Sequence, residues 1–327
     1  MALRLTFVDE HIARQSQRLT SEYYPHRKHW PARLFHHAPL ENAVAILQAG
    51  VLRSRNDPLN PHPRDVAAPD VINTRGDAHD YVRLYFRPKT PTQYSIEGIR
   101  KPNECPYGEV THAPFLVVFA LDARSVLCQP DVRFSDRNMQ LGATVSGDTE
   151  DYFGQIPFEK VFSKGNTGGD RSITDARSAE VLASSPLSLR DCLREIYFRS
   201  EPERDTVLHM LGAQREPWAR MCHVSDALKV FQKRHTFVQE VTLTPEGITF
   251  LLNPRHDLAQ IKVAISITDA AGHRVADFYN EALDARPPGN NRWIYKYDFA
   301  DGTYKVEIHL EGHLAYRAII PLDSILF

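Results

Sequence analysis

The chain has 327 residues, 42% of them hydrophobic, which is enough to bury the core of one large domain or two smaller ones. Its formal net charge of −2 excludes a strongly basic protein that coats nucleic acid indiscriminately, although a local basic groove is compatible with it. The four cysteines form no Cys-x-x-Cys pair, and no apolar run reaches the ~18 residues of a membrane span. We therefore expect a cytoplasmic protein with no signal peptide, no membrane segment and no disulfide framework.

The first elements are a short helix over residues 9–20 and a segment, residues 21–33, that mixes aromatic with basic side chains. That mixture suits stacking on single-stranded bases beside neutralised phosphates. The preferred interpretation is a surface segment whose aromatic side chains pack on the domain.

A strand over residues 34–38 then leads into a helix that ends at Gly50. Pro39 suits the first helical turn, and apolar residues recur at helical spacing from Leu40 to Leu47. This arrangement places His36 at the end of a strand, beside a helix N-terminus whose free amides favour an anion such as a pyrophosphate. A lone histidine is more often a structural group.

Residues 53–80 are rich in Pro, Asn, Asp and Arg, and they are too long for an idle connection, so we expect a functional loop or lid that includes Arg75. Strands are expected at 81–86, 115–121, 132–135 and 195–199. Residues 142–170 read as a long loop anchored once by the apolar residues 156–162. Ser200-x-x-Glu203 forms a capping box that starts a helix to about residue 211, and another helix is expected at 224–233.

Glu180 lies in the otherwise apolar strand fragment 177–182, where an isolated carboxylate is costly unless a partner compensates it. Two interpretations are open. One is a structural salt bridge to Arg177 or to another arginine, and the other is a functional carboxylate.

The residue pattern of the sequence changes after Arg234. Short β-branched or aromatic runs, separated by turn signals, predict strands at 238–242, 248–252, 261–268, 274–278, 293–299, 303–310 and 316–320. About seven strands at this spacing indicate an immunoglobulin-like β-sandwich without its disulfide. We place the domains at 1–236 and 237–327.

In order and spacing, three segments within residues 34–211 resemble the DarT family of NAD-dependent ADP-ribosyltransferases, which modify nucleic-acid bases. They are His36 with Asn42 and the Ile-Leu-x-x-Gly ending at Gly50, then residues 84–91, and then Ala179-Glu180-Val181-Leu182. The family often has His-x-Thr where this chain has Ala38 in third place, so one hydroxyl contact to NAD is absent or replaced. The C-terminal sandwich lies outside the resemblance.

The resemblance implies an α+β fold: an ADP-ribosyltransferase-like mixed domain with central β-sheets and peripheral helices, ahead of the sandwich. It also implies that Glu180 and Arg75 are catalytic, with Arg53 and Arg55 as rivals for the arginine. His36, Ala38, Asn42, Arg53 and Tyr85 would line the NAD site. NAD would be the substrate, and no metal site is expected.

The acceptor implied by the resemblance is a base of single-stranded DNA, with the chain acting as a toxin or phage-defence effector. RNA as acceptor, or a non-catalytic binding module, are the alternatives. The sandwich is expected to recognise a partner such as an antitoxin or a phage component.

Overall fold

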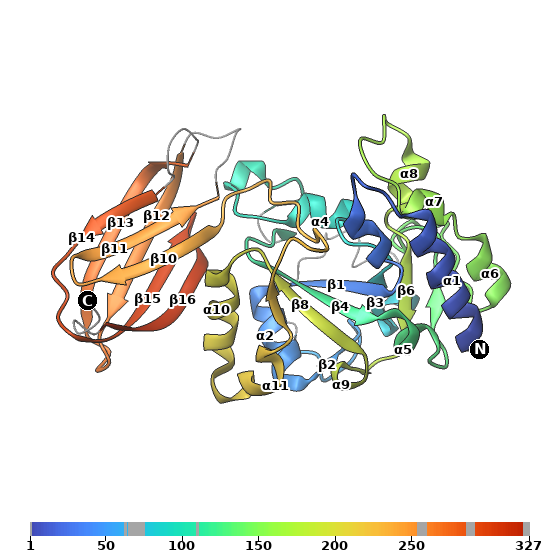
Figure 1. Cartoon of the computed structure of the whole chain (residues 1–327), viewed down its shortest axis with the longest axis horizontal. Helices are drawn as coiled ribbons and strands as arrows, with labels where there is room; N and C mark the ends of the chain where they lie inside the picture. Colours follow the sequence, from blue (N-terminus) through green and yellow to red (C-terminus); the bar gives the residue numbers. More distant parts are fainter. Residues whose placement is uncertain are drawn as a thin grey trace. The chain divides into compact units, whose positions relative to one another are not determined.

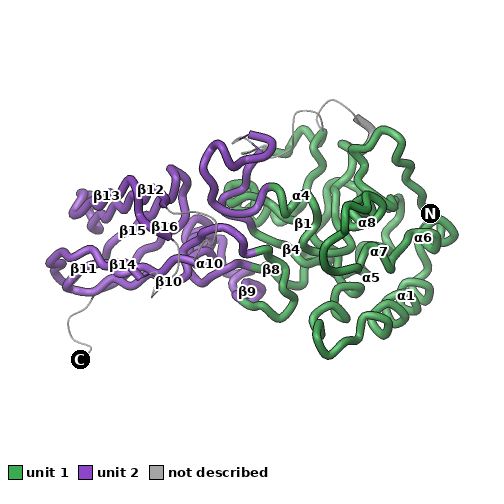
Figure 2. The backbone as a smooth tube through the Cα atoms, turned by 90° about the horizontal axis from the view of Figure 1, so that it is seen from above, with its two compact units in different colours: residues 1–95, 117–197, 225–232 green, residues 96–116, 198–224, 233–327 purple. Residues whose placement is uncertain are grey.

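The computed structural model describes residues 2–61, 64, 76–108, 111–253, 260–285 and 292–322. The chain forms two compact units, and each is assembled from separate chain segments (Figure 2). Residues 1–95, 117–197 and 225–232 form unit 1, and residues 96–116, 198–224 and 233–327 form unit 2. The expected division into a domain of residues 1–236 and a sandwich of residues 237–327 stays a prediction.

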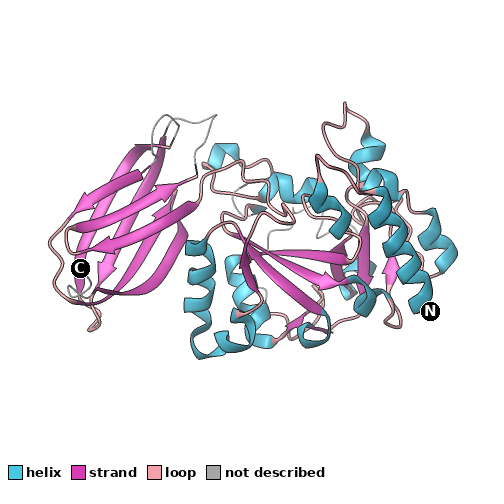
Figure 3. Cartoon of the chain, in the orientation of Figure 1, coloured by secondary structure: helices cyan, strands magenta, loops and turns pink. Residues whose placement is uncertain are grey.

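Unit 1 is built on six strands of one sheet, which lie in the order β5-β6-β3-β1-β4-β8 (Figures 1 and 3). The strands are β1 (Arg33–Pro39), β3 (Val82–Tyr85), β4 (Leu116–Asp122), β5 (Arg133–Phe134), β6 (Glu180–Ala183) and β8 (Leu193–Phe198). Every residue of β4 is buried, which fits its continuous apolar sequence. The pairs β1–β3, β3–β6, β5–β6 and β4–β8 are antiparallel.

Short helices surround this sheet, together with a small ladder of β2 (Val51–Leu52) and β7 (Leu187–Ser188). They are α1 (Leu5–Arg18), η1 (Pro25–His29), α2 (Leu40–Ala49), η2 (Gly76–Asp80), α4 (Pro91–Ile96), α5 (Ala123–Leu127), α6 (Glu150–Gln155), α7 (Phe158–Val161), α8 (Arg171–Ala176) and α9 (Leu189–Cys192). The helix expected to end at Gly50 is confirmed as α2, and Gly50 caps it at φ 68°, a left-handed conformation that glycine adopts without strain. Among the described residues, no helix combines the length and the apolar character needed to cross a bilayer.

Two expected elements of unit 1 are wrong. The segment 142–170 was expected to be a loop, but it holds α6 and α7, with α6 capped by the Thr149 hydroxyl, which accepts from the Tyr152 amide at 3.2 Å. The expected helix at 224–233 is absent. Its backbone carbonyls instead accept hydrogen bonds from side chains elsewhere: Leu228 from the Trp30 indole at 3.0 Å and Val230 from Gln93 at 2.8 Å.

Unit 2 contains the helical segments η3 (Pro102–Glu104), α10 (Glu201–Leu211), η5 (Gly212–Arg215) and α11 (Glu216–Ala219), the strand β9 (Cys222–Val224), and two antiparallel sheets. The order β10-β11-β14 makes one sheet and β13-β12-β15-β16 the other. The strands are β10 (Val238–Thr244), β11 (Gly247–Leu252), β12 (Gln260–Thr268), β13 (Arg274–Asp284), β14 (Arg292–Lys296), β15 (Gly302–Leu310) and β16 (His313–Leu322). All seven expected C-terminal strands are therefore confirmed.

The two sheets share one apolar core, to which both contribute fully buried residues such as Phe250 and Ile265. In chain order the fourth strand, β13, pairs with β12, whereas in the constant-type immunoglobulin sandwich the fourth strand pairs within the other sheet. The immunoglobulin-like class of this region therefore stays a proposal. The helix α10 packs against β10 and β16, where the Ser200 hydroxyl donates to the Val238 carbonyl at 2.6 Å.

Candidate functional site

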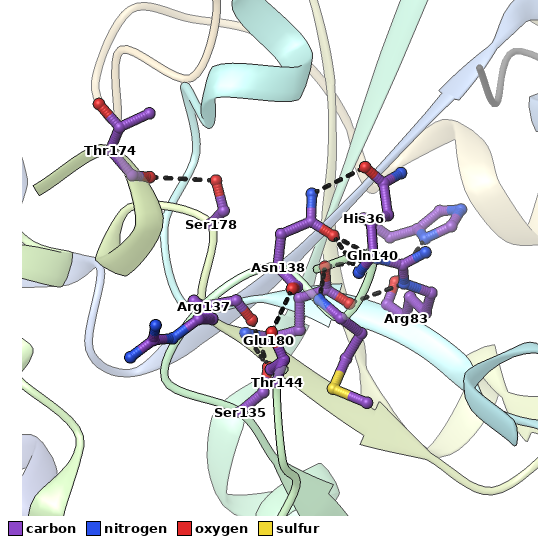
Figure 4. A network of polar contacts seen from close by, with 11 residues as sticks. His36, Arg83, Ser135, Arg137, Asn138, Gln140, Thr144, Thr174, Ser178 and Glu180 are labelled. Atoms are coloured by element: carbon purple, nitrogen blue, oxygen red, sulfur yellow. Dashed lines mark hydrogen bonds and ion pairs between the residues drawn. The ribbon is translucent and has the colours of Figure 1, made fainter. Parts of the chain in front are cut away.

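Glu180 and Arg83 form the centre of the candidate site, on the neighbouring strands β6 and β3 (Figure 4). The Arg83 guanidinium donates from Nε to Oε2 at 2.7 Å and from Nη2 to Oε1 at 2.5 Å. The Glu180 side chain is fully buried, while that of Arg83 is 23% exposed. Each residue is the only charge in its strand, so the bidentate pair compensates what would otherwise be an isolated charge in an apolar sheet.

A loop that follows β5 encloses this pair from one side. The Met139 amide donates to Glu180 Oε1 at 3.4 Å, and Met139 itself is buried against Ala78 and Leu182. The Asn138 amide oxygen accepts from Arg83 Nη2 at 3.0 Å. The loop therefore fixes the orientation of both charged groups through the packing of one methionine.

Backbone contacts hold the start of β6 as well. The Ser135 hydroxyl accepts from the Glu180 amide at 3.2 Å and donates to the Arg137 carbonyl at 2.7 Å. The Ser135 amide donates to the Glu180 carbonyl at 2.9 Å. Glu180 is thus fixed at its backbone and at both carboxylate oxygens, which preorganises the carboxylate before any ligand binds.

Electrostatics favour the charged form of Arg83. Burial works against the charge of Arg83, but the Glu180 carboxylate and its hydrogen bonds outweigh it, so the pKa of Arg83 is raised above its ordinary value. The carboxylate accepts three hydrogen bonds from described residues and has about four acceptor sites, so it keeps capacity for one further donor.

His36 lies beside the pair on β1, and its Nδ1–H donates to the Arg83 carbonyl at 3.1 Å. Burial lowers the pKa of His36, so the ring is neutral at pH 7. In the tautomer that this bond requires, Nε2 is an acceptor, which suits a ligand hydroxyl.

Tyr85 faces the same part of the sheet, since its Cα is paired both with Phe35 and with Glu180. Its ring stacks on His37 with centroids 5.3 Å apart. Burial and the Glu180 charge raise the pKa of Tyr85 to about 12, so the hydroxyl stays protonated at pH 7. The β1–β3–β6 pairing therefore places Tyr85 beside Glu180, whereas the contact of His36 is with the Arg83 backbone carbonyl.

The other expected residues make their contacts elsewhere. Asn42, on α2, exchanges two hydrogen bonds with the backbone of residue Arg64, at 2.7 and 2.9 Å. Ala38 is buried at the end of β1. Arg53 pairs with Asp57 at 2.9 Å. Arg75 lies outside the described residues.

Arg83, Ser135 and Asn138 were missed by the sequence reasoning. Arg83 had a usable signal, because it is the only charge in its predicted strand, residues 81–86. The salt-bridge interpretation of Glu180 is right in kind, with Arg83 as the partner. Arg177 instead donates from Nε to the Ser163 hydroxyl at 3.1 Å. No sequence pattern identifies Ser135 and Asn138, because only the path of the folded loop places them beside Glu180 and Arg83.

Among the residues that the structure describes, no cluster of His, Cys, Asp and Glu could hold a metal ion. The site therefore offers a buried carboxylate, a paired guanidinium, a neutral imidazole and a phenol. These groups suit recognition of a hydroxylated, partly cationic ligand by hydrogen bonds and stacking.

The sequence model of one family, described as ssDNA thymidine ADP-ribosyltransferase, DarT, matches residues 35–227. Among solved structures, the chain is similar to Thermus sp. 2.9 DarT in complex with ADP-ribosylated ssDNA, at 19% identity and TM-score 0.47, over 57% of this chain and 90% of that one. It is also similar to Thermosipho africanus DarTG in complex with ADP-ribose, at 14% identity and TM-score 0.45, over 68% of this chain and 55% of that one. No curated protein matches the sequence.

Proposed function

The chain belongs to the DarT family of NAD-dependent ADP-ribosyltransferases, and from that premise we propose that it attaches ADP-ribose to thymidine in single-stranded DNA, with Glu180 as the catalytic carboxylate. The matched residues 35–227 include β3, β6 and all but the first two residues of β1, the strands that carry the candidate site. The observation that supports the proposal most strongly is the buried Glu180 carboxylate, held at both oxygens by Arg83 and paired across the sheet with Tyr85.

The proposed reaction breaks one bond and forms one. The bond between nicotinamide and the ribose anomeric carbon breaks, and nicotinamide leaves with the electron pair, which cancels its pyridinium charge. A nucleophilic atom of the base attacks the anomeric carbon and loses its proton to the surroundings. Positive charge develops on the ribose in between, so a carboxylate placed against it lowers the barrier.

Glu180 would accept a hydrogen bond from a ribose hydroxyl through its remaining acceptor site and stabilise the charge on the ring. Arg83 would act as a positioning residue that holds the carboxylate oriented through its two hydrogen bonds. Because both groups sit on strands, their geometry is set by the sheet rather than by a flexible loop.

The expected cofactor residues take the following proposed roles. His36 Nε2 would accept from a ribose hydroxyl, and the Tyr85 ring would offer a face to nicotinamide or to the acceptor base. Asn42 would support the site by holding the backbone of residue 64. Arg53, paired with Asp57, and Arg75 remain proposed phosphate or acceptor contacts.

The proposal is tested by incubating the protein with labelled NAD and matched single-stranded DNA, single-stranded RNA and duplex DNA, followed by mass spectrometry of the nucleosides. Label on thymidine of single-stranded DNA alone, lost in Glu180→Ala, is the expected result, since a base must be out of the duplex to react. Label on RNA alone would replace the acceptor and keep the chemistry. No label on any acceptor, with NAD intact, would contradict the enzymatic proposal and favour a binding module.

We also propose a toxin or phage-defence role in the cytoplasm, where DNA and NAD are both found, because modified template bases stall replication. Expression in a bacterial host should be harmful for the wild type and harmless for Glu180→Ala. Residues 237–327 are proposed to recognise a partner such as an antitoxin or a phage component. Co-expression that relieves toxicity of the full chain but not of a variant with altered sandwich surface would support that role.

A further inference from the structure

Resting on this proposed acceptor, we propose that the segment before the family-matched residues, together with two lysines from later in the chain, forms a second binding surface for the same single strand, outside the catalytic centre. We call it the aromatic–basic surface and define it as Tyr23, Tyr24, Lys164 and Lys229. These residues come from three separate stretches of unit 1. The surface would hold nucleotides that flank the modified base.

Tyr23 is the clearest sign of a ligand surface. It is 84% exposed, more than any other large hydrophobic side chain among the described residues. Its ring lies 6.5 Å from that of Tyr24, which is half-buried. The interpretation of residues 21–33 as aromatic side chains packed on the domain therefore holds for Trp30, at 3% exposed, and is wrong for Tyr23.

Lys164 is placed over the Tyr24 ring by a buried arginine, Arg87, which acts as an anchor. Arg87 donates from Nη1 to the carbonyls of Val161 and Ser163, at 2.8 and 2.7 Å, and so fixes the chain just before Lys164. The Lys164 ammonium lies 2.9 Å from the centre of the Tyr24 ring, and its side chain is exposed. The same lysine is thus positioned by a cation–π contact and can still face a phosphate.

Lys229 is positioned by the contact between Arg87 and Trp30. The Arg87 guanidinium lies 5.3 Å from the centre of the Trp30 ring, and the Trp30 indole donates to the Leu228 carbonyl at 3.0 Å. Lys229 follows directly and is exposed, with a φ of 47°. One buried Trp–Arg contact therefore gathers the three stretches of chain.

The charges that act on His26, next to the Tyr24 ring, are positive. Burial lowers the pKa of His26 to about 4, and the charges that lower it further are Lys229, Lys89 and Arg27. Glu22 is the only carboxylate in residues 20–30. Exposed aromatic faces among positive charges are the combination by which proteins hold single strands without reading sequence, through stacking and phosphate neutralisation.

The test is binding of the full chain to a fluorescent single-stranded DNA of about 20 nucleotides, without NAD, measured by anisotropy at several salt concentrations. Tyr23→Ala should weaken binding by about fivefold or more, the loss expected for one stacked base. Lys164→Gln with Lys229→Gln should lower the salt slope by about 1.4, from two phosphate contacts. Arg190→Gln, at an exposed arginine of α9, is the matched control and should change neither quantity.

Transfer assays separate this surface from the catalytic centre. The variants should raise KM for the long oligonucleotide with kcat unchanged, and they should leave transfer to an acceptor of about 4 nucleotides as in the wild type. Wild-type affinity and salt slope in the Tyr23 and lysine variants would overturn the inference. If no acceptor is labelled by any form of the protein, the proposed function fails, and the anisotropy data still decide whether this surface binds a single strand.

Discussion

Replacing Glu180 by glutamine removes the charge and keeps the shape of the side chain. In the wild type, Oε2 accepts from Arg83 Nε, and Oε1 accepts from Arg83 Nη2 and from the Met139 amide. A glutamine must place its NH₂ group where one of the two carboxylate oxygens stood. The NH₂ group is a donor, and there it faces another donor. The less costly orientation puts it opposite Arg83 Nε, so at least one hydrogen bond becomes a repulsive contact.

We expect Glu180→Gln to lower both the free energy of unfolding and the rate of transfer. Breaking a buried ion pair costs about 3–5 kcal/mol, and we expect the lower end, about 3 kcal/mol, because the Arg83 side chain is 23% exposed and keeps its bond to Asn138. If Glu180 stabilises the charge on the ribose, transfer should fall about a hundredfold, which corresponds to ~3 kcal/mol of the barrier. Urea denaturation and initial rates with labelled NAD measure the two effects separately.

Glu203→Gln is the matched control. Glu203 is also a buried glutamate in a bidentate pair with an arginine, Arg199. Both residues belong to unit 2, and both side chains are at most 2% exposed. Its loss should lower stability by a similar amount and leave transfer unchanged wherever the protein is folded. A folded Glu180→Gln that keeps more than about a tenth of wild-type transfer would refute the catalytic role. An equal loss of transfer in both variants would show that the effect is one of stability.

Three further outcomes are expected. Arg83→Lys keeps the charge but loses one of two hydrogen bonds to Glu180, so urea denaturation should show a loss of about 1.5 kcal/mol, and kcat should fall more than KM changes; an unchanged kcat would contradict the positioning role. Burial, with Arg14 and Arg18, lowers the pKa of His11 to about 3, so the unfolded chain binds more protons between pH 6.5 and 3, and stability should fall as pH falls through that window. The expected loss between pH 7 and pH 5 is up to about 2 kcal/mol, and His11→Phe should flatten that slope in denaturation curves. Residues 1–236 expressed alone should be less soluble than the full chain, because α10 loses its contacts with β10 and β16; a soluble, cooperatively folding fragment in calorimetry would contradict this.

Local sequence decided most of the secondary structure. The helix ending at Gly50 and the C-terminal strands follow from periodicity and turn residues, which act over a few neighbouring positions. The helix expected at 224–233 does not form, because this segment is controlled by contacts that are distant in the sequence. Its carbonyls bind side chains from Trp30 and Gln93, far away in the sequence, and such partners outweigh local propensity.

The site divides in the same way. Glu180 was identifiable from sequence, because an isolated carboxylate in an apolar strand needs an explanation, and the family resemblance pointed to the same residue. Its partner was decided by strand pairing, which places β3 beside β6 and so Arg83 beside Glu180 across 97 positions of sequence. The loop contacts from Ser135, Asn138 and Met139 depend on tertiary packing alone. Sequence thus identified which group is unusual, and only the folded sheet determined what compensates and orients it.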